Sequence, residues 1–313
     1  MKRDENCLPE GFRSETPENR AALASPEGLR RAGNAVLEAV ASRCSCAHDL
    51  LVELGWTTAV IPRAECALGL DTGETREIAI LSRVGKPVCF HVTRIDESVS
   101  PPAVTLSRKA VLEEAQEMLL DSLSPGDVLP ARVTHIEPFG VFVDIGCGVV
   151  SMMGIEHLSV SRILHPAERF RPGQDIYAVV SGVDRASKRI TLSHRELLGT
   201  WEENAALFSP GETVRGIVRS VENYGVFVEL MPNLSGLAER RAGLKEGQTV
   251  SVFLKSIVPE RMKIKLTIID LIPPPAENPP APHYFITEGH IDHWIYTPPV
   301  CDTKYIETCF SSP

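Results

Sequence analysis

The sequence predicts an all-β chain of three small closed barrels, and an internal repeat together with a strand-like apolar pattern predicts them. Residues 124–127 (Ser-Pro-Gly-Asp) lead to 139–144 (Phe-Gly-Val-Phe-Val-Asp). The same phrase returns at 209–212 (Ser-Pro-Gly-Glu) and 224–229 (Tyr-Gly-Val-Phe-Val-Glu), in a constant register of 85 residues. A repeat at a fixed period indicates one structural unit used several times.

A second matching block closes each copy of the repeat. Gly173-Gln174 through Ser193 matches Gly247-Gln248 through Thr267 with a register of 74, so the last copy has lost 11 residues between the blocks. A fainter copy comes first, with 50–55 matching 141–146 and 105–108 matching the repeat end. We therefore predict three repeats, which span 30–108, 124–193 and 209–270.

Each repeat has short Val- and Ile-rich runs broken by Gly, Pro and charged turns, which is typical of strands. In the second repeat the predicted strands are 128–136, 141–146, 149–155, 175–183 and 188–193. The stretch 157–172 is the long connection between the third and fourth strands, where the third repeat is shorter. Five short strands in so small a unit bury a core by closing on themselves, so we predict five-stranded OB-fold barrels.

The segments outside the repeats differ in composition. Residues 1–29 hold three prolines among charges and are predicted to be a disordered arm. Linkers 109–123 and 194–208 are predicted to be helical, because Val111, Ala115, Met118 and Leu119 in one, and Leu197, Leu198, Trp201, Ala205 and Phe208 in the other, form apolar stripes that would pack between barrels. Residues 271–313 are predicted to be a Pro-rich linker and a C-terminal tail, in which 284–287 and 294–297 would pair as a hairpin.

The net charge of −9 argues at first against a nucleic-acid binder. The acidic excess lies outside the repeats, however: the first and second repeats are neutral and the third is +2. Such barrels would bind single strands by stacking and a few local cations. The alternative is that these charges are only solvated surface.

Composition also limits the class of protein. The charged N-terminus and the lack of 18 consecutive apolar residues predict a cytoplasmic protein without a membrane span. Eight cysteines without a Cys-x-x-Cys pair indicate reduced thiols. The sequence has no phosphate-binding Gly-Lys-Ser/Thr loop, no Gly-x-Ser-x-Gly and no His-Glu-x-x-His, so we expect no enzyme, no catalytic residue and no cofactor.

The aromatic residues of the repeated phrase suggest a binding face. Val141, Val143 and Ile145 are expected to point into the barrel, while Phe142 and Asp144 point out. A bulge at Gly140 would bring Phe139 to the face of Phe142, and Tyr224 and Phe227 would pair in the same way in the third repeat. Base stacking is a common use of such pairs. The alternative is packing of the rings against a neighbouring barrel or linker.

These motifs resemble the S1 RNA-binding domain, specifically in the second and third repeats and less closely in the first. The linker from Ser193 to Asn204 also resembles the inter-domain helix of the short S1-like ribosomal proteins of clostridia-type Gram-positive bacteria. The family pattern has two aromatics on the second strand, a histidine ending the third, an aspartate after the fourth and an arginine on the fifth.

The resemblance implies candidate RNA-binding residues. The second repeat supplies Phe139, Phe142, Asp184 and Arg189; its histidine position holds Gly154, and His157 nearby is either a contributor or a loop histidine that caps a turn. The third repeat supplies Tyr224, Phe227 and Lys263 and is a weaker copy. Lys188 and Lys265 are the further cations expected to reach phosphates.

The first repeat departs furthest from the pattern. Its aromatic positions hold His48 and Leu51, and Ala103 stands where the arginine would be, although Asp96 matches the aspartate. We therefore expect a degenerate barrel that docks on a protein. No metal site is predicted: Cys44, Cys46 and His48 have no second ligand pair, and the tail residues His283, His290, His293, Cys301 and Cys309 match no standard spacing.

Three functions fit the resemblance. The first is a short ribosomal-S1-like protein that binds single-stranded messenger RNA at the 30S small ribosomal subunit. The second is a protein-interaction adaptor, and the third is a regulatory or stress-related RNA-binding factor off the ribosome.

Overall fold

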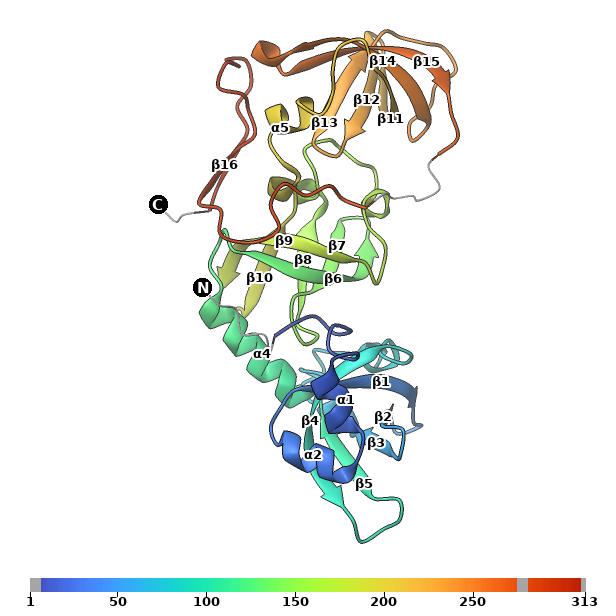
Figure 1. Cartoon of the computed structure of the whole chain (residues 1–313), viewed down its shortest axis with the longest axis vertical. Helices are drawn as coiled ribbons and strands as arrows, with labels where there is room; N and C mark the ends of the chain where they lie inside the picture. The colour runs from blue at the N-terminus through green and yellow to red at the C-terminus, as the bar shows by residue number, and fades with distance from the viewer. Residues whose placement is uncertain (1–6, 275–280, 311–313) are drawn as a thin grey trace. The chain divides into compact units, whose positions relative to one another are not determined.

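The computed structural model describes residues 7–274 and 281–310, so residues 1–6, the 275–280 part of the Pro-rich linker and the last three residues lie outside the description. The chain forms two compact units. The first extends to Ser122 and includes the turn 144–150; the second comprises 123–143 and the chain from Ser151 onward. Three closed five-stranded barrels confirm the predicted all-β, OB-type architecture (Figure 1).

Barrel 1 consists of β1 to β5 in the order β1-β2-β3-β5-β4, with β3 and β5 parallel. Its strands are β1 (Leu37–Cys44), β2 (Leu50–Glu53), β3 (Thr58–Ile61), β4 (Pro87–Asp96) and β5 (Ala103–Ser107). Between β3 and β4 lie η1 (Arg63–Glu65) and α3 (Ile78–Leu81). Leu50, Val52, Ile61 and Phe90 are fully buried and belong to the core.

Barrel 2 repeats the same circular order. Its elements are β6 (Val128–Glu137), β7 (Gly140–Asp144), β8 (Val150–Gly154), β9 (Asp175–Asp184) and β10 (Arg189–Ser193), with η2 (Ile155–His157) and η3 (Pro166–Glu168) between β8 and β9. The five predicted strands are therefore confirmed to within about two residues at each end. Val141, Val143 and Ile145 are fully buried, as expected for the inward positions.

Barrel 3 has the order β11-β12-β13-β15-β14. Its elements are β11 (Thr213–Glu222), β12 (Gly225–Met231), β13 (Leu234–Ala238), β14 (Thr249–Val258), η5 (Pro259–Arg261) and β15 (Lys263–Leu271). β13 and β15 are parallel, which closes the barrel as in the other two copies.

The N-terminal arm is ordered over residues 7–29, so the prediction of disorder is wrong for this part. It contains α1 (Pro17–Leu23) and α2 (Pro26–Ala32), with a proline in the first turn of each. Proline is favoured in the first turn of a helix because the N–H group that it lacks would have no hydrogen-bond partner within the helix. The two prolines, which indicated disorder in the sequence, therefore begin helices. The buried Glu10 carboxylate accepts from Arg108 at 2.9 and 3.1 Å, and this ion pair helps to hold the arm within the first unit.

The two linkers differ in how regular they are. Linker 109–123 is the helix α4 (Lys109–Ser122), in which Val111, Ala115 and Leu119 of the predicted apolar stripe are buried and Met118 is half-buried. Linker 194–208 is not one helix: η4 (Arg195–Leu198) and α5 (Trp201–Ala205) are separated at Gly199, whose φ is 80°. In the described part of the chain, no helix combines the length and apolar character needed to cross a membrane.

The tail does not form the predicted hairpin. Residues 284–287 are not a strand; instead β16 (His293–Ile295) pairs with β17 (Glu307–Cys309). The earlier segment is fixed by tertiary contacts, since Tyr177 N–H donates to the Tyr284 hydroxyl at 3.2 Å and Phe285 N–H donates to Leu197 O at 2.9 Å. Figure 1 shows the red tail passing beside β9 and then along α5, within the second unit. Residues 284–287 therefore pack on barrel 2 through Tyr284 and do not pair with 294–297 as strands.

Candidate nucleic-acid interface

Barrel 2 carries an exposed aromatic pair. The centroids of Phe139 and Phe142 are 6.1 Å apart and the rings are edge-to-face at 89°. Phe139 is 55% exposed, although it is a large apolar side chain. The two rings therefore lie together on the surface, as predicted.

The physical reason for this pairing differs from the predicted bulge at Gly140. In barrel 3 Glu222 pairs with Gly225, so Tyr224 lies in the two-residue turn between β11 and β12 and the turn directs it. Phe139 likewise precedes β7. The glycine is needed for close strand packing: a Cβ at Gly140 would lie 2.4 Å from Met153 O, and one at Gly225 would lie 2.6 Å from Ala238 O.

Barrel 3 repeats the arrangement with little change. The ring centroids of Tyr224 and Phe227 are 6.2 Å apart at 88°, and Tyr224 is 70% exposed. The pairing of Phe227 with Leu237, and of Leu237 with Lys265, extends this face across β12, β13 and β15. A cation and an aromatic pair thus share one surface row.

The surface positions equivalent to Phe227, Leu237 and Lys265 hold different residue types in barrels 1 and 2. In barrel 2, Met152 on β8 pairs with Thr191 on β10. Hydrogen bonds from Ile155 N–H to Phe139 O and from Ile145 N–H to Val149 O place Phe142 opposite Met152. In barrel 1 the row is Leu51, Val60 and Thr105, with neither an aromatic ring nor a cation.

Asp144 does not face solvent, contrary to the expectation for an outward position of β7. It is buried and accepts hydrogen bonds from the backbone N–H groups of Glu10, Gly146 and Gly148. Burial, followed by the neighbouring Glu10 carboxylate, raises the pKa of Asp144 to about 7. This carboxyl group is structural, and it belongs to the first unit.

Asp184 and Arg189 face each other across the β9–β10 hairpin, and both are exposed. The Asp184 carboxylate is engaged by its own turn: it accepts from the Ser187 hydroxyl and from the backbone N–H groups of Ser187 and Ala186. The hydrogen bond from the Ser187 side chain is the main reason why the pKa of Asp184 lies below its usual value. Lys188 is in the left-handed region of this turn (φ 52°). Asp184 therefore shapes the turn that presents the two cations.

His157 lies at the other end of barrel 2. Strands β8 and β10 run parallel, with Met152 opposite Thr191. Arg189 is the first residue of β10, whereas His157 comes after the last residue of β8, so the two residues lie at opposite ends of this strand pair. The His157 carbonyl accepts from His194 N–H at 2.9 Å, and its ring Nε2 is 3.6 Å from Glu156 Oε1. The structure therefore separates His157 from Asp184 and Arg189, so the side chains predicted to bind RNA on barrel 2 do not form one compact site.

Three surface residues were missed from the sequence. The His135 ring on β6 lies 6.3 Å from the Phe142 ring at 30°, and Met152 and Leu237 are the middle members of the surface rows. The alternation of outward positions along β6, β8 and β13 is the signal that could have found them. In barrel 3, Lys263 and Lys265 are both exposed, as their predicted role requires.

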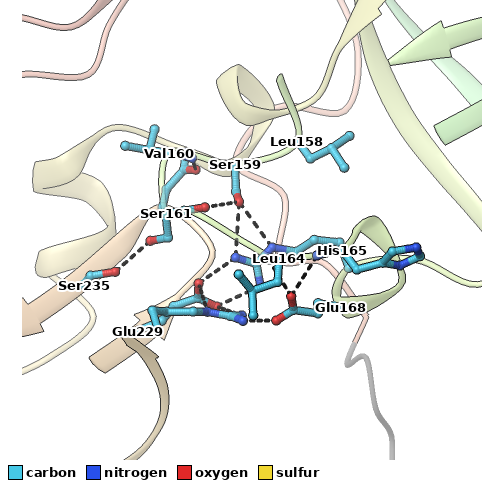
Figure 2. A network of polar contacts seen from close by, with 12 residues as sticks. Leu158, Ser159, Val160, Ser161, Leu164, His165, Glu168, Glu229 and Ser235 are labelled. Atoms are coloured by element: carbon cyan, nitrogen blue, oxygen red, sulfur yellow. Dashed lines mark hydrogen bonds and ion pairs between the residues drawn. The ribbon is translucent and has the colours of Figure 1, made fainter. Parts of the chain in front are cut away.

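Barrels 2 and 3 are linked by buried charges. Arg169, from the loop between β8 and β9, donates to both carboxylate oxygens of Glu229 on β12 at 2.8 and 2.6 Å. Arg219 on β11 donates to the same carboxylate at 2.8 and 3.0 Å and also pairs with Glu168. Figure 2 shows Glu168, Glu229 and Ser159 converging in this network. Although burial opposes the shift, Arg219 holds the pKa of Glu168 below its usual value.

The metal-capable residues noted in the sequence do not gather. Within residues 7–274 and 281–310, no group of three or more His, Cys, Asp or Glu side chains could hold a metal ion. His290 instead contacts Asp127 at 2.6 Å, and His293 contacts Glu307 at 2.6 Å.

Fold and surface together define a tandem OB-fold protein whose second and third barrels expose paired aromatic rings, the feature that OB-folds use to stack single-stranded bases. The second barrel is identified more narrowly. Residues 122–195 match the model of the S1 RNA binding domain, which confirms the predicted resemblance for the second repeat.

Curated proteins extend the similarity beyond that domain. The chain is 33% identical over 203 residues to the small ribosomal subunit protein bS1 homolog of Bacillus subtilis, which covers 60% of this chain and 52% of that protein. It is 34% identical over 186 residues to small ribosomal subunit protein bS1 of Staphylococcus aureus, covering 54% and 47%. The chain thus matches about half the length of these relatives.

One solved structure extends along more of the chain but is less similar. A multidomain protein with nucleic acid binding domains from Streptococcus pneumoniae is 16% identical, with a TM-score of 0.25, covering 75% of this chain and 73% of that one.

Proposed function

We propose that this protein binds single-stranded RNA through barrels 2 and 3. The observation that carries the proposal is the exposed edge-to-face pair at the same place on both barrels, Phe139 with Phe142 and Tyr224 with Phe227. Exposed aromatic pairs are unfavourable on a surface that nothing covers, and each base stacked on such a ring contributes about 1–3 kcal/mol. The cations assigned to phosphates are the exposed Arg189 and Lys188 on barrel 2, and Lys263 and Lys265 on barrel 3, of which Lys265 shares the surface row of Phe227.

We further propose that the RNA is messenger RNA and that the partner is the 30S small ribosomal subunit. The printed names of the Bacillus and Staphylococcus relatives, small ribosomal subunit proteins, support this assignment. On this proposal the protein acts in the cytoplasm in translation, as a component or helper of the subunit, and catalyses no reaction.

Barrel 1 has a different role in this proposal. Its surface row of Leu51, Val60 and Thr105 offers no ring on which a base could stack. We therefore assign it to docking on a protein, for which an aliphatic, half-buried row is better suited.

Alanine substitution tests the RNA assignment. Phe142→Ala should weaken RNA binding by about 1–3 kcal/mol, and Phe227→Ala should weaken it less, because barrel 3 is the weaker copy of the S1 pattern. Leu51→Ala should leave the affinity unchanged. Binding of a labelled single strand is measured by fluorescence anisotropy, with circular dichroism as the control for folding. Unchanged affinity in a folded Phe139→Ala/Phe142→Ala variant would remove the stacking assignment and favour a protein adaptor.

Co-sedimentation tests the ribosomal assignment separately. The protein should co-sediment with small subunits, and ribonuclease treatment that removes messenger RNA should reduce the bound fraction. A protein that binds RNA but never sediments with subunits would instead be a regulatory factor off the ribosome.

A further inference from the structure

A groove of about 570 Å³ lies between the long loop of barrel 2 and the aromatic face of barrel 3. Tyr224 and Phe227 line one side, and Ile163 and Leu164 from the loop line the other. Leu164 is 73% exposed and Tyr224 is 70% exposed, so large apolar side chains border an open space. The volume falls in the range of about 300–1,000 Å³ that is typical of small-molecule sites.

The loop that forms one wall is fixed to barrel 3. Val160 N–H donates to Asn233 Oδ1 at 2.9 Å, and Ser161 N–H donates to Pro232 O at 3.1 Å. The hydroxyls of Ser161 and Ser235 are 2.8 Å apart, as Figure 2 shows. Together with the Arg169–Glu229 ion pair, these bonds hold the wall in place without a ligand.

The charges of the lining indicate how a ligand would be held. Three basic and three acidic side chains line the groove, so it carries no net charge: Arg162, Arg219, Lys304, Glu168, Glu222 and Glu246. Arg219 is neutralised by Glu168 and Glu229. Among the ion pairs of the described residues, neither Arg162 nor Lys304 has a carboxylate partner. The groove therefore offers a stacking surface and two cations without an ion-pair partner, together with the carboxylates of Glu222 and Glu246, which form no ion pair among the described residues either.

We propose that this groove is a composite nucleotide site for single-stranded RNA. One base stacks on Tyr224 and Phe227 with Leu164 beside it, while its phosphate contacts Arg162 or Lys304. The inference rests on the proposed RNA binding and adds a specific element, because the loop of one barrel completes the site of the next. RNA fits better than a peptide, since every base has a face that stacks on an aromatic ring and every nucleotide of the strand supplies a phosphate for the cations.

The test is a double-mutant cycle in the full chain with Arg162→Glu and Tyr224→Ala. Both residues are exposed, so neither substitution disturbs a core. The probe is a fluorescein-labelled single-stranded RNA of about 16 nucleotides, near the upper site size of one OB barrel. Arg215→Glu is the matched control, because Arg215 is an exposed arginine of barrel 3 that does not line the groove.

The expected result is a loss of about fivefold or more in affinity for Tyr224→Ala. Arg162→Glu should also weaken binding several-fold, lower the salt slope by about one and exceed the Arg215→Glu control. In the Tyr224→Ala background the effect of Arg162→Glu should largely disappear, because a shared nucleotide couples the two side chains.

Two failures can be told apart. If Phe142→Ala weakens RNA binding but Tyr224→Ala and Arg162→Glu do not, the composite site is wrong and RNA binding by barrel 2 stands. The composite site is also wrong if the effects of Arg162→Glu and Tyr224→Ala are additive and Arg162→Glu weakens binding no more than the control Arg215→Glu does. If the unaltered protein binds no RNA, both proposals fail and a protein ligand for the groove takes their place.

Discussion

The buried carboxylate of Glu229 is predicted to be the main link between barrels 2 and 3. Its side chain is 4% exposed and accepts four hydrogen bonds, two from Arg169 and two from Arg219. Both arginine side chains are also buried, at 7% and 8% exposed. Substitution Glu229→Gln keeps the shape and removes the charge.

The expected cost follows from what each arginine retains. Without the Glu229 charge, Arg219 still has Glu168, but Arg169 keeps only the Ser159 hydroxyl, at 3.2 and 3.3 Å. Leaving a buried charge without its partner costs about 3–5 kcal/mol, and the amide oxygen of Gln recovers part of this. We expect Glu229→Gln to destabilise the second unit by about 3 kcal/mol. Arg169→Met should cost about 2 kcal/mol, because Glu229 then keeps Arg219.

Urea unfolding followed by tryptophan fluorescence measures this effect. Two of the three tryptophans, Trp201 and Trp294, lie in the core that barrel 3 shares with the tail. A loss of 3 kcal/mol lowers the urea midpoint by about 1 M or more. The control is Asp175→Asn, which breaks the more exposed pair with Arg132 and should cost less than about 1 kcal/mol. If Glu229→Gln costs no more than this control, the network does not hold the barrels together.

Three further predictions concern the tail, pH and salt. A Cβ at Gly199 would lie 2.5 Å from the Phe285 ring, so Gly199→Ala should displace the tail and make it more sensitive to limited proteolysis. Gly173 also has a positive φ but its Cβ would lie in open space, so Gly173→Ala should leave the sensitivity of the tail unchanged. Burial lowers the pKa of His194 to about 4, below its usual 6.5, so the unfolded chain binds the proton more tightly than the folded chain does. The free energy of unfolding should therefore fall by about 3 kcal/mol as the pH drops from about 6.5 to 4. The urea midpoint of the His194→Gln variant should depend less on pH. With about four cations contacting phosphates, log affinity should fall with log salt with a slope of about −3, and a slope near −10 would contradict stacking-led binding.

The strands of barrel 2 could be predicted because local sequence alone decides them. Val141, Val143 and Ile145 are buried at every second position of the run, and glycines and prolines mark the turns. The aromatic pairs could be found for the same reason, since Phe139 and Phe142 lie close in sequence. The bulge was a wrong reason for a correct pairing, because a two-residue turn also brings the first ring to the surface.

The arm and the tail could not be predicted because their order depends on distant partners. Glu10 is held by Arg108, 98 residues away, and Tyr284 contacts Tyr177 and His194 at separations of 107 and 90 residues. Composition describes only local preference, so a proline- and charge-rich arm appeared disordered. Likewise, the alternation in residues 284–287 predicted a strand, although His194 and Tyr177 use the Tyr284 hydroxyl as a tertiary contact.

The loop 157–172 of barrel 2, which is longer than its counterpart in the third repeat, has a structural role in barrel 3. The segment in which the third repeat is 11 residues shorter is the segment that supplies Arg169, Glu168 and Ser161 to barrel 3. The β-barrel itself does not need this insertion, since barrel 3 closes without it. Its buried ion pairs and its position beside Tyr224 indicate instead that it fixes the neighbouring barrel and borders that barrel's aromatic face. The loop of one barrel thereby borders the aromatic face of the next, which is where we propose that a nucleotide binds.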